Sequence, residues 1–269
     1  MTSTWGALVL ASACAWAQDA PVIPRLDHVH AQLDLARDCR GAMIGLVGEA
    51  RGRARAVAVS AYRAVGRYFP ASGASVAQAS FRAAELLRAG GEAGAAEAAF
   101  RRVAGQACAP VLAARARLEA GHLHRREERA LEALAVYGIL ALDPRTPRRE
   151  RSLGALWGAR VLADAGHLAA AAAVWERVLR RATDPLLRVR ASDDWGVSLA
   201  DAGDFEAAAG VLHLCRLAVA ERAAELTELG ARVRRALEGM RLVGRLARGV
   251  RERHAASTPL LIGRVRIHR

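Results

Sequence analysis

Residues 195–212, WGVSLADAGDFEAAAGVL, carry apolar side chains at helical spacing, but Gly203 interrupts the pattern. A glycine inside a helix costs about 1 kcal/mol relative to alanine, whereas a glycine directly after a helix adopts positive φ without penalty. Small residues, Gly196 and Ala208, occupy the apolar face where a core normally has bulk. The segment therefore predicts two antiparallel helices that turn at Gly203 and pack closely through their small residues.

The same pattern recurs along the chain with spacings of 37, 38 and 37 residues. An alanine in each predicted second helix is followed by a large side chain and preceded by another small residue in the first helix. The alanines are Ala96, Ala133, Ala171 and Ala208, the large residues are Phe100, Tyr137, Trp175 and Leu212, and the first-helix residues are Ala84, Gly121, Ala159 and Gly196. Glycine separates the helices at positions 91, 166 and 203, with Glu128 as the exception. One helix pair cannot bury its own faces, so the pairs are expected to stack into an α-solenoid.

These columns resemble the tetratricopeptide repeat, which combines small residues, a turn glycine, a large residue and a closing proline in one register. The prolines that follow the large residues here are Pro110, Pro144 and Pro185. The resemblance covers residues 77–218 and implies an all-α, right-handed solenoid of stacked antiparallel helix pairs. It also implies a scaffold that binds other proteins.

A degenerate repeat is expected upstream, within the N-terminal helices of 18–76. Ala58 and Tyr62 stand 38 residues before Ala96 and Phe100, and the first helix of this unit is expected at about 38–50. The stretch SAYRAVGRYFPASGASVAQASFRAAELL is similar in texture to bacterial envelope-associated repeat proteins of the outer-membrane assembly lipoprotein and Tol–Pal coordinator type.

The repeat columns stop after Cys215. Residues 219–254 are expected to form helices that cap the open end of the solenoid, the last of them spanning 231–254. Residues 255–269 form a basic tail.

The N-terminus has the layout of a secretory signal. An apolar run from Trp5 to Ala13 precedes the small-x-small triplet that ends at Ala17, so cleavage after Ala17 predicts a periplasmic or cell-envelope protein. The segment carries no Lys or Arg, and the alternative is an ordinary apolar N-terminus of a cytoplasmic protein. Cys14 would carry the lipid in a lipoprotein variant. No window reaches the roughly 18 consecutive apolar residues of a membrane span, so no transmembrane helix is expected in the mature chain.

The formal net charge is +13, and every basic residue other than histidine is an arginine, because the chain contains no lysine. The charge favours acidic partners or anionic surfaces. The arginines are spread along every predicted helix with little aromatic interleaving, a pattern that does not favour nucleic acid. The two densest patches are 143–152 and 231–254, and each is interpreted either as a solvated face or as a site for an anionic polymer or membrane surface.

The sequence offers little for catalysis or cofactor binding. The His-x-His pairs at 28–30 and 122–124 point apart on a helix, and His124 with Glu128 would supply only two of the three or four ligands that a metal site needs. Asp193 and Asp194 are expected to be an exposed pair near a helix start. The remaining cysteines are interpreted as small buried hydrophobes. No enzymatic activity, metal or cofactor is predicted.

In tetratricopeptide arrays, positions 2, 5, 9 and 12 of the first helices face a concave groove. Transferred to this chain, the resemblance predicts a basic groove with apolar patches that binds an acidic, partly apolar peptide. Its residues are Phe81, Glu85, Arg88, Arg115, Leu118, His122, Arg125, Leu156, Arg160, Arg190 and Asp193. The lysines and asparagines of the family's carboxylate clamp are missing, but arginine binds carboxylates in a bidentate manner.

Overall fold

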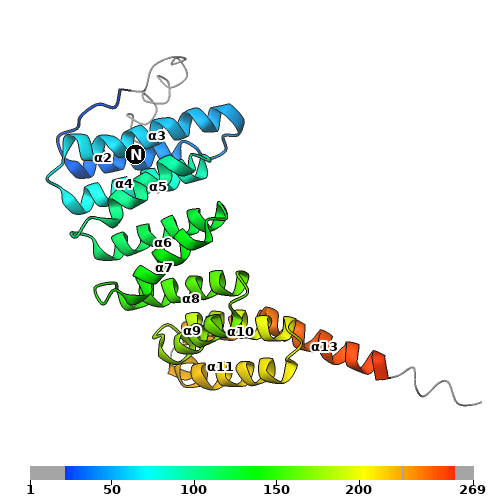
Figure 1. Cartoon of the computed structure of the whole chain (residues 1–269). Coiled ribbons are helices and arrows are strands. Elements are labelled where there is room, and N and C mark those ends of the chain that lie inside the picture. Colours follow the sequence, from blue (N-terminus) through cyan, green and yellow to red (C-terminus); the bar gives the residue numbers. More distant parts are fainter. Residues whose placement is uncertain (1–21, 226, 258–269) are drawn as a thin grey trace, which may run out of the picture. The chain divides into compact units, whose positions relative to one another are not determined.

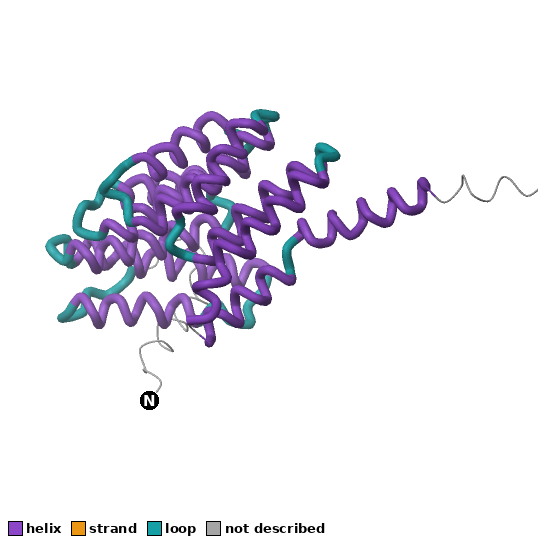
Figure 2. The backbone as a smooth tube through the Cα atoms, turned by 90° about the horizontal axis from the view of Figure 1, so that it is seen from below, coloured by secondary structure: helices purple, strands orange, loops and turns teal. Residues whose placement is uncertain are grey.

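The computed structural model describes residues 22–225 and 227–257, and all regular structure in these ranges is helical (Figures 1 and 2). The predicted signal segment, Cys14 and the tail beyond Ser257 lie outside the described residues. The chain divides into two units, of which the first extends to Val136 and includes Pro144–Pro147. The second comprises Tyr137–Asp143 and the residues from Arg148 onward.

The first unit is a layered stack of helices. Its helices are α2 (Val29–Gly41), α3 (Gly48–Tyr68), α4 (Gly73–Ala89), α5 (Ala93–Ala104), α6 (Pro110–Arg126) and the beginning of α7 (Ala130–Leu142). From α2 to α6 each helix packs against the next, and α4 also contacts α2 and α6. One hydrophobic core runs through these layers, with Tyr62, Phe81 and Phe100 as its largest side chains.

The second unit continues the same construction and ends in additional helices. It contains the end of α7, then α8 (Arg148–Asp164), α9 (Leu168–Arg181), α10 (Pro185–Asp201), α11 (Phe205–Glu225), α12 (Thr227–Glu238) and α13 (Arg241–Ser257). Consecutive helices from α8 to α12 pack together, and α10 and α11 both contact α12 and α13. Trp157, Trp175 and Trp195 all belong to this unit, and among the residues described, the first unit has no tryptophan.

The predicted repeat register is confirmed by burial. Ala96, Ala133, Ala171 and Ala208 all have 0% of their surface exposed. The large residues that follow them are fully or almost fully buried in the first three repeats, and Leu212 is half-buried. Small side chains let two helices approach closely: at Gly154 an added Cβ would lie 2.6 Å from Leu140 Cβ and 3.0 Å from a backbone oxygen of α7.

The four turns inside the helix pairs share one backbone geometry. Gly91, Gly166 and Gly203 have φ of 80°, 84° and 85°, and Glu128 has φ of 59° at the equivalent position. In each turn the amide of the residue after the positive-φ position donates a hydrogen bond to a carbonyl of the preceding helix. Glu92 donates in this way to Leu87 (3.0 Å) and Arg129 to His124 (2.9 Å). These are Schellman bonds, which satisfy the last carbonyls of the helix.

Three details of the predicted organisation are wrong. The helix expected at about 38–50 does not exist, because α2 ends at Gly41 and a turn leads into α3 at Gly48. The helix expected over 231–254 is two helices, since the chain breaks at Gly239 and Met240. Two of the closing prolines, Pro110 and Pro185, instead begin the next helix, where the missing amide proton costs nothing.

Candidate functional site

In the first unit, α4 and α6 are the first helices of their repeats, and their accessible faces form the surface that the sequence predicted as a groove. We call such a surface the first-helix surface. Phe81 does not reach this surface: it is 2% exposed and meets Phe100 edge to face, with ring centroids 5.5 Å apart. The Arg115 guanidinium lies over the Phe81 ring, 5.4 Å from its centroid. Phe81 therefore belongs to the core and supports an exposed arginine, and its predicted role as a groove contact is wrong.

Ion pairs occupy the charged groups of α4. Arg88 donates to Glu119 of α6, and Arg82 donates to Glu85 at 2.6 Å. Leu118 and His122 of α6 are half-buried and Arg125 is exposed. Apart from Phe81, the predicted residues of this unit are therefore at least partly accessible, but Arg88 and Glu85 already have partners.

A depression of about 550 Å³ adjoins the ion pairs of α4. The α2–α3 turn supplies Met43 and Ile44, of which Ile44 is 86% exposed. The arginines of its wall are Arg40, Arg51, Arg82 and Arg88, against the single carboxylate of Glu85. This lining is basic and partly apolar.

In the second unit the corresponding surface lies on α8 and α10. Leu156 is fully buried, so it is a core residue and its predicted role as a groove contact is wrong as well. The neighbouring Trp157 is half-buried and is flanked by two guanidinium groups. Arg160 lies 4.3 Å and Arg190 lies 5.2 Å from the ring centroid. We call Trp157, Arg160 and Arg190 the Trp157 cluster.

Two aspartates in the middle of α10 organise this surface. Asp194 is 5% exposed and binds both ends of the Arg160 guanidinium, with Arg160 Nη2 2.7 Å from Oδ1. Asp193 accepts hydrogen bonds from the Leu242 amide at 2.9 Å and from Arg241 Nε at 3.0 Å. Asp193 thus fixes the start of α13, and the expectation of an exposed pair near a helix start is wrong.

Arg190 differs from Arg160, the other arginine of the cluster. It forms no ion pair or hydrogen bond with any other residue in the described part of the chain. Burial lowers its pKa, the charge of Arg160 lowers it further, and Asp194 partly opposes both effects. A partly desolvated cation without a carboxylate partner beside an indole ring is suited to bind an anionic group.

Asp194, Trp157 and Arg241 were not among the residues predicted from the sequence. If repeats are counted from 77, 114, 152 and 189, the sixth positions are Arg82, Glu119, Trp157 and Asp194. Glu119 and Asp194 each bind an arginine of the preceding first helix. The predicted stripe fails at its fifth position in two repeats, where Phe81 and Leu156 fall in the core, while its other positions are accessible. In the sequence, these ion pairs could have been recognised as opposite charges that stand about one repeat apart.

The His-x-His motif of α6 contributes to an internal ion-pair cluster. His124 is 5% exposed, and its Nε2 lies 3.7 Å from a carboxylate oxygen of Glu97, which also accepts a 2.7 Å bond from Arg129. Glu128 is not a partner of His124 in these contacts, and His124 is not the solvated residue that was expected. No group of three or more His, Cys, Asp or Glu within the described ranges is arranged to hold a metal ion.

Two of the three described cysteines match their predicted role as buried hydrophobes. Burial raises the pKa of Cys39 to about 11 and also raises that of Cys215, whereas Cys108 is exposed.

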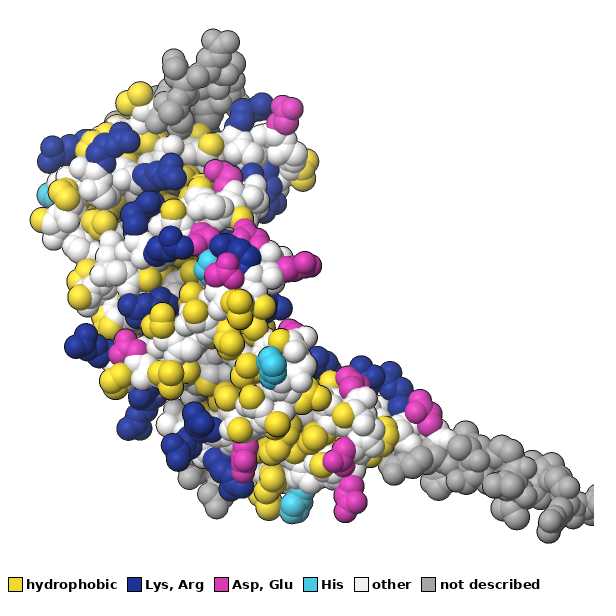
Figure 3. Space-filling model, in the orientation of Figure 1, with side chains coloured by type: hydrophobic (Ala, Val, Ile, Leu, Met, Phe, Trp, Pro, Cys, Tyr) yellow, Lys and Arg dark blue, Asp and Glu magenta, His cyan; other side chains and the backbone are white. Residues whose placement is uncertain are grey.

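Within residues 22–225 and 227–257, no helix is both long and apolar enough to cross a membrane. Arginines are distributed over the visible face of both units and do not gather at one place (Figure 3).

Comparison with known proteins identifies the fold. Two similar solved structures are both of a kinesin light chain-like protein with nearly identical TPR-like repeats from Podosopora anserina. One aligns at 17% identity with a TM-score of 0.50 and covers 75% of this chain and 100% of that one. The other aligns at 16% identity with a TM-score of 0.49, covering 73% and 99%. No protein-family model and no curated protein matches the sequence. At this identity the first alignment shows the fold alone, which is TPR-like.

Proposed function

We propose that this protein is a non-enzymatic scaffold whose first-helix surfaces bind an acidic, partly apolar segment of another protein. The Trp157 cluster carries the proposal. Tryptophan and arginine are the residue types that dominate binding energy at protein interfaces, and here they stand together with one guanidinium unpaired. A carboxylate of the partner would bind Arg190 while an apolar side chain covers the indole of Trp157.

The depression beside α4 supports the same specificity in the first unit. Its arginines outnumber its carboxylate, and Met43 and Ile44 add apolar surface from the α2–α3 turn. An acidic peptide with interspersed apolar residues matches both surfaces in charge and in polarity. Basic peptides are disfavoured, since they would place like charges opposite the arginines.

The test is capture of partners from an envelope fraction with the full chain as bait. Trp157→Ala and Arg190→Glu should each reduce capture of the specific partner at least tenfold. Arg216→Glu is the matched control, because this arginine is exposed on α11 and the charge change is the same. Full capture by both cluster variants, or a comparable loss with Arg216→Glu, would show that the cluster is not the binding surface. Circular dichroism verifies that each variant keeps its helical content.

We propose in addition that the scaffold acts in the bacterial cell envelope. The supporting observation is the signal-like layout of residues 1–17. Export predicts a mature protein that begins at Gln18, which an intact-mass measurement on material from the native host would detect. Retention of Met1 or Thr2 would place the protein in the cytoplasm, and a lipid on Cys14 would identify an anchored lipoprotein.

A further inference from the structure

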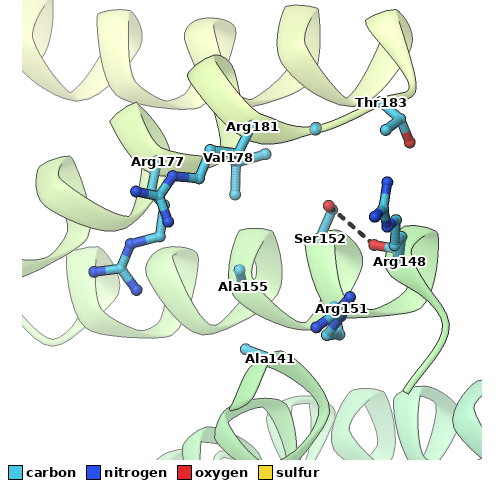
Figure 4. Close-up of a pocket in the computed structure, with 10 residues that line it drawn as sticks. Ala141, Arg148, Arg151, Ser152, Ala155, Arg177, Val178, Arg181 and Thr183 are labelled. Carbon is cyan, nitrogen blue, oxygen red and sulfur yellow. Dashed lines mark hydrogen bonds between the residues drawn. The ribbon is translucent and has the colours of Figure 1, made fainter. Parts of the chain in front are cut away.

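A second depression lies on the side of α8 opposite to the Trp157 cluster. Arg148, Arg151, Ser152 and Ala155 follow one another at i, i+3, i+4 and i+7, so they share one face of α8, whereas Trp157 points away from that face. The depression has a volume of about 310 Å³ and is closed on its other side by α9 and the α9–α10 turn (Figure 4). We call it the α8–α9 pocket.

Four arginines line the α8–α9 pocket. Arg148 and Arg151 come from α8, and Arg177 and Arg181 stand one turn apart on α9 (Figure 4). No Asp or Glu is among the residues that line it. None of the four guanidinium groups forms an ion pair with a carboxylate of the described chain. The nearby carboxylates of Asp184 and Glu176 are engaged elsewhere, with Arg149 at 3.4 Å and Arg180 at 2.8 Å.

The pocket lining therefore carries no internal counter-charge for its arginines. Elsewhere in the described chain, arginines such as Arg88 and Arg160 are paired with carboxylates, whereas the pocket offers its arginines none. A guanidinium presents a planar fork of donors that matches phosphoryl oxygens in a bidentate manner. Thr183 and Ser152 add hydroxyl groups to the lining, although the Ser152 hydroxyl already donates to the Arg148 carbonyl at 3.2 Å.

We infer that the α8–α9 pocket binds a compact polyphosphate group such as a diphosphate. Four positive charges exceed what a single phosphate dianion neutralises, whereas two linked phosphoryl groups match them more closely. The volume is at the lower end of the range for small-molecule sites, about 300–1,000 Å³, and excludes an extended polymer from its interior. The phosphoryl groups can belong to a free small molecule or to a lipid headgroup, and the inference does not depend on the proposed peptide-binding surface.

The test titrates pyrophosphate into the full chain by calorimetry. Saturable binding is expected, with at least a tenfold loss in affinity for the double variant Arg151→Gln/Arg181→Gln. The matched control is Arg102→Gln/Arg126→Gln, which removes the same charge from exposed positions on α5 and α6 and should change the affinity less than twofold. Absence of saturable binding to the unmodified chain, or equal losses in both double variants, overturns the inference.

Two further measurements complete the test. Thermal unfolding should show a higher midpoint with pyrophosphate for the unmodified chain and the control but not for the pocket variant, because a ligand that binds the folded state stabilises it. Sedimentation with phosphatidylcholine vesicles containing phosphatidylinositol bisphosphate distinguishes the sources. Vesicle binding that the pocket variant loses assigns the site to a lipid headgroup, and pyrophosphate binding without vesicle binding assigns it to a soluble phosphate compound.

Discussion

The turn at Glu128 and the turns at Gly91, Gly166 and Gly203 have the same backbone geometry although their sequences differ. All four residues have positive φ, and all four turns close with the same pair of Schellman bonds. A side chain in the left-handed region costs roughly 1–2 kcal/mol, which glycine avoids. The turn at Glu128 forms despite this strain. Glycine therefore lowers the free energy of the turn but is not required for its geometry.

The packing of the helix pairs is what these turns have in common. In each repeat the small residue of the second helix is fully buried, and this fixes the distance between the two helices and hence the path of the turn. The Glu128 turn has an additional tether, since Arg129 binds Glu97 of the neighbouring pair as well as Glu127. Packing therefore has priority over turn residues in this fold.

The largest expected effect is overpacking of the third repeat. Ala171→Trp places a large side chain at a position with no exposed surface and should lower the free energy of unfolding by about 3 kcal/mol or more. Ala172→Trp is the control, because Ala172 is half-buried and should tolerate the bulk better. Urea unfolding followed by circular dichroism measures both, and equal losses would refute the repeat register.

A smaller loss of unfolding free energy is expected when glutamate, the residue of the Glu128 turn, replaces glycine in one of the other turns. Gly166→Glu forces a side chain into φ near 84° and should cost about 1–2 kcal/mol. The loss should be clearly below that of Ala171→Trp in the same helix pair, as measured in the same urea experiment. A greater loss would mean that glycine, and not packing, determines the turn.

The reverse exchange should stabilise the protein. Glu128→Gly relieves the strain of positive φ but increases the entropy of the unfolded chain, so the net gain is expected to be about 0.5–1 kcal/mol. Glu127→Gly is the control, because Glu127 does not have positive φ, so its added flexibility and the loss of its bond to Arg129 should both destabilise. A loss of stability in Glu128→Gly would contradict the strain argument.

The smallest effect concerns the tether of the Glu128 turn and its dependence on pH. The hydrogen bond from Arg129 lowers the pKa of Glu97 below 4.5, burial opposes this, and the charge of His124 adds to the lowering. Since the pKa is lower in the folded state, the stabilisation is complete above the unfolded value and disappears as pH falls through the folded value. The difference in melting temperature between the unmodified chain and Glu97→Gln should therefore be constant near neutral pH and shrink in acid. A difference that grows in acid would exclude this role for Glu97.

Most of the fold could be predicted from the sequence, because the same pattern of packing residues occurs in each repeat and the copies can be aligned with each other. Ala96, Ala133, Ala171 and Ala208 could be aligned without a structure, and all of them are buried as expected. The α2–α3 turn and the break at Gly239 occur outside the repeats, where no second copy indicates the register. There the tertiary packing of single segments decides the helix ends.

The candidate site was predicted less well than the fold. Accessibility on a helix changes within one residue, so the family template selected the buried Leu156 although its neighbour Trp157 is the accessible residue. Ion pairing between repeats was also hard to predict from the sequence, since Arg160 contacts Asp194 only when their two repeats stack. The α8–α9 pocket brings together residues from two helices, and the sequence indicated only the dense patch that contains Arg148 and Arg151.

The distribution of tryptophan gives the protein a built-in optical reporter. Trp157, Trp175 and Trp195 belong to the second unit, and once residues 1–17 are removed by the proposed export they are the only tryptophans of the chain. Intrinsic tryptophan fluorescence of the mature protein therefore follows the unfolding of the second unit, while the far-ultraviolet circular dichroism signal follows the helices of both. The separation between the two denaturation curves then measures how independently the first unit unfolds, without any label or engineered probe.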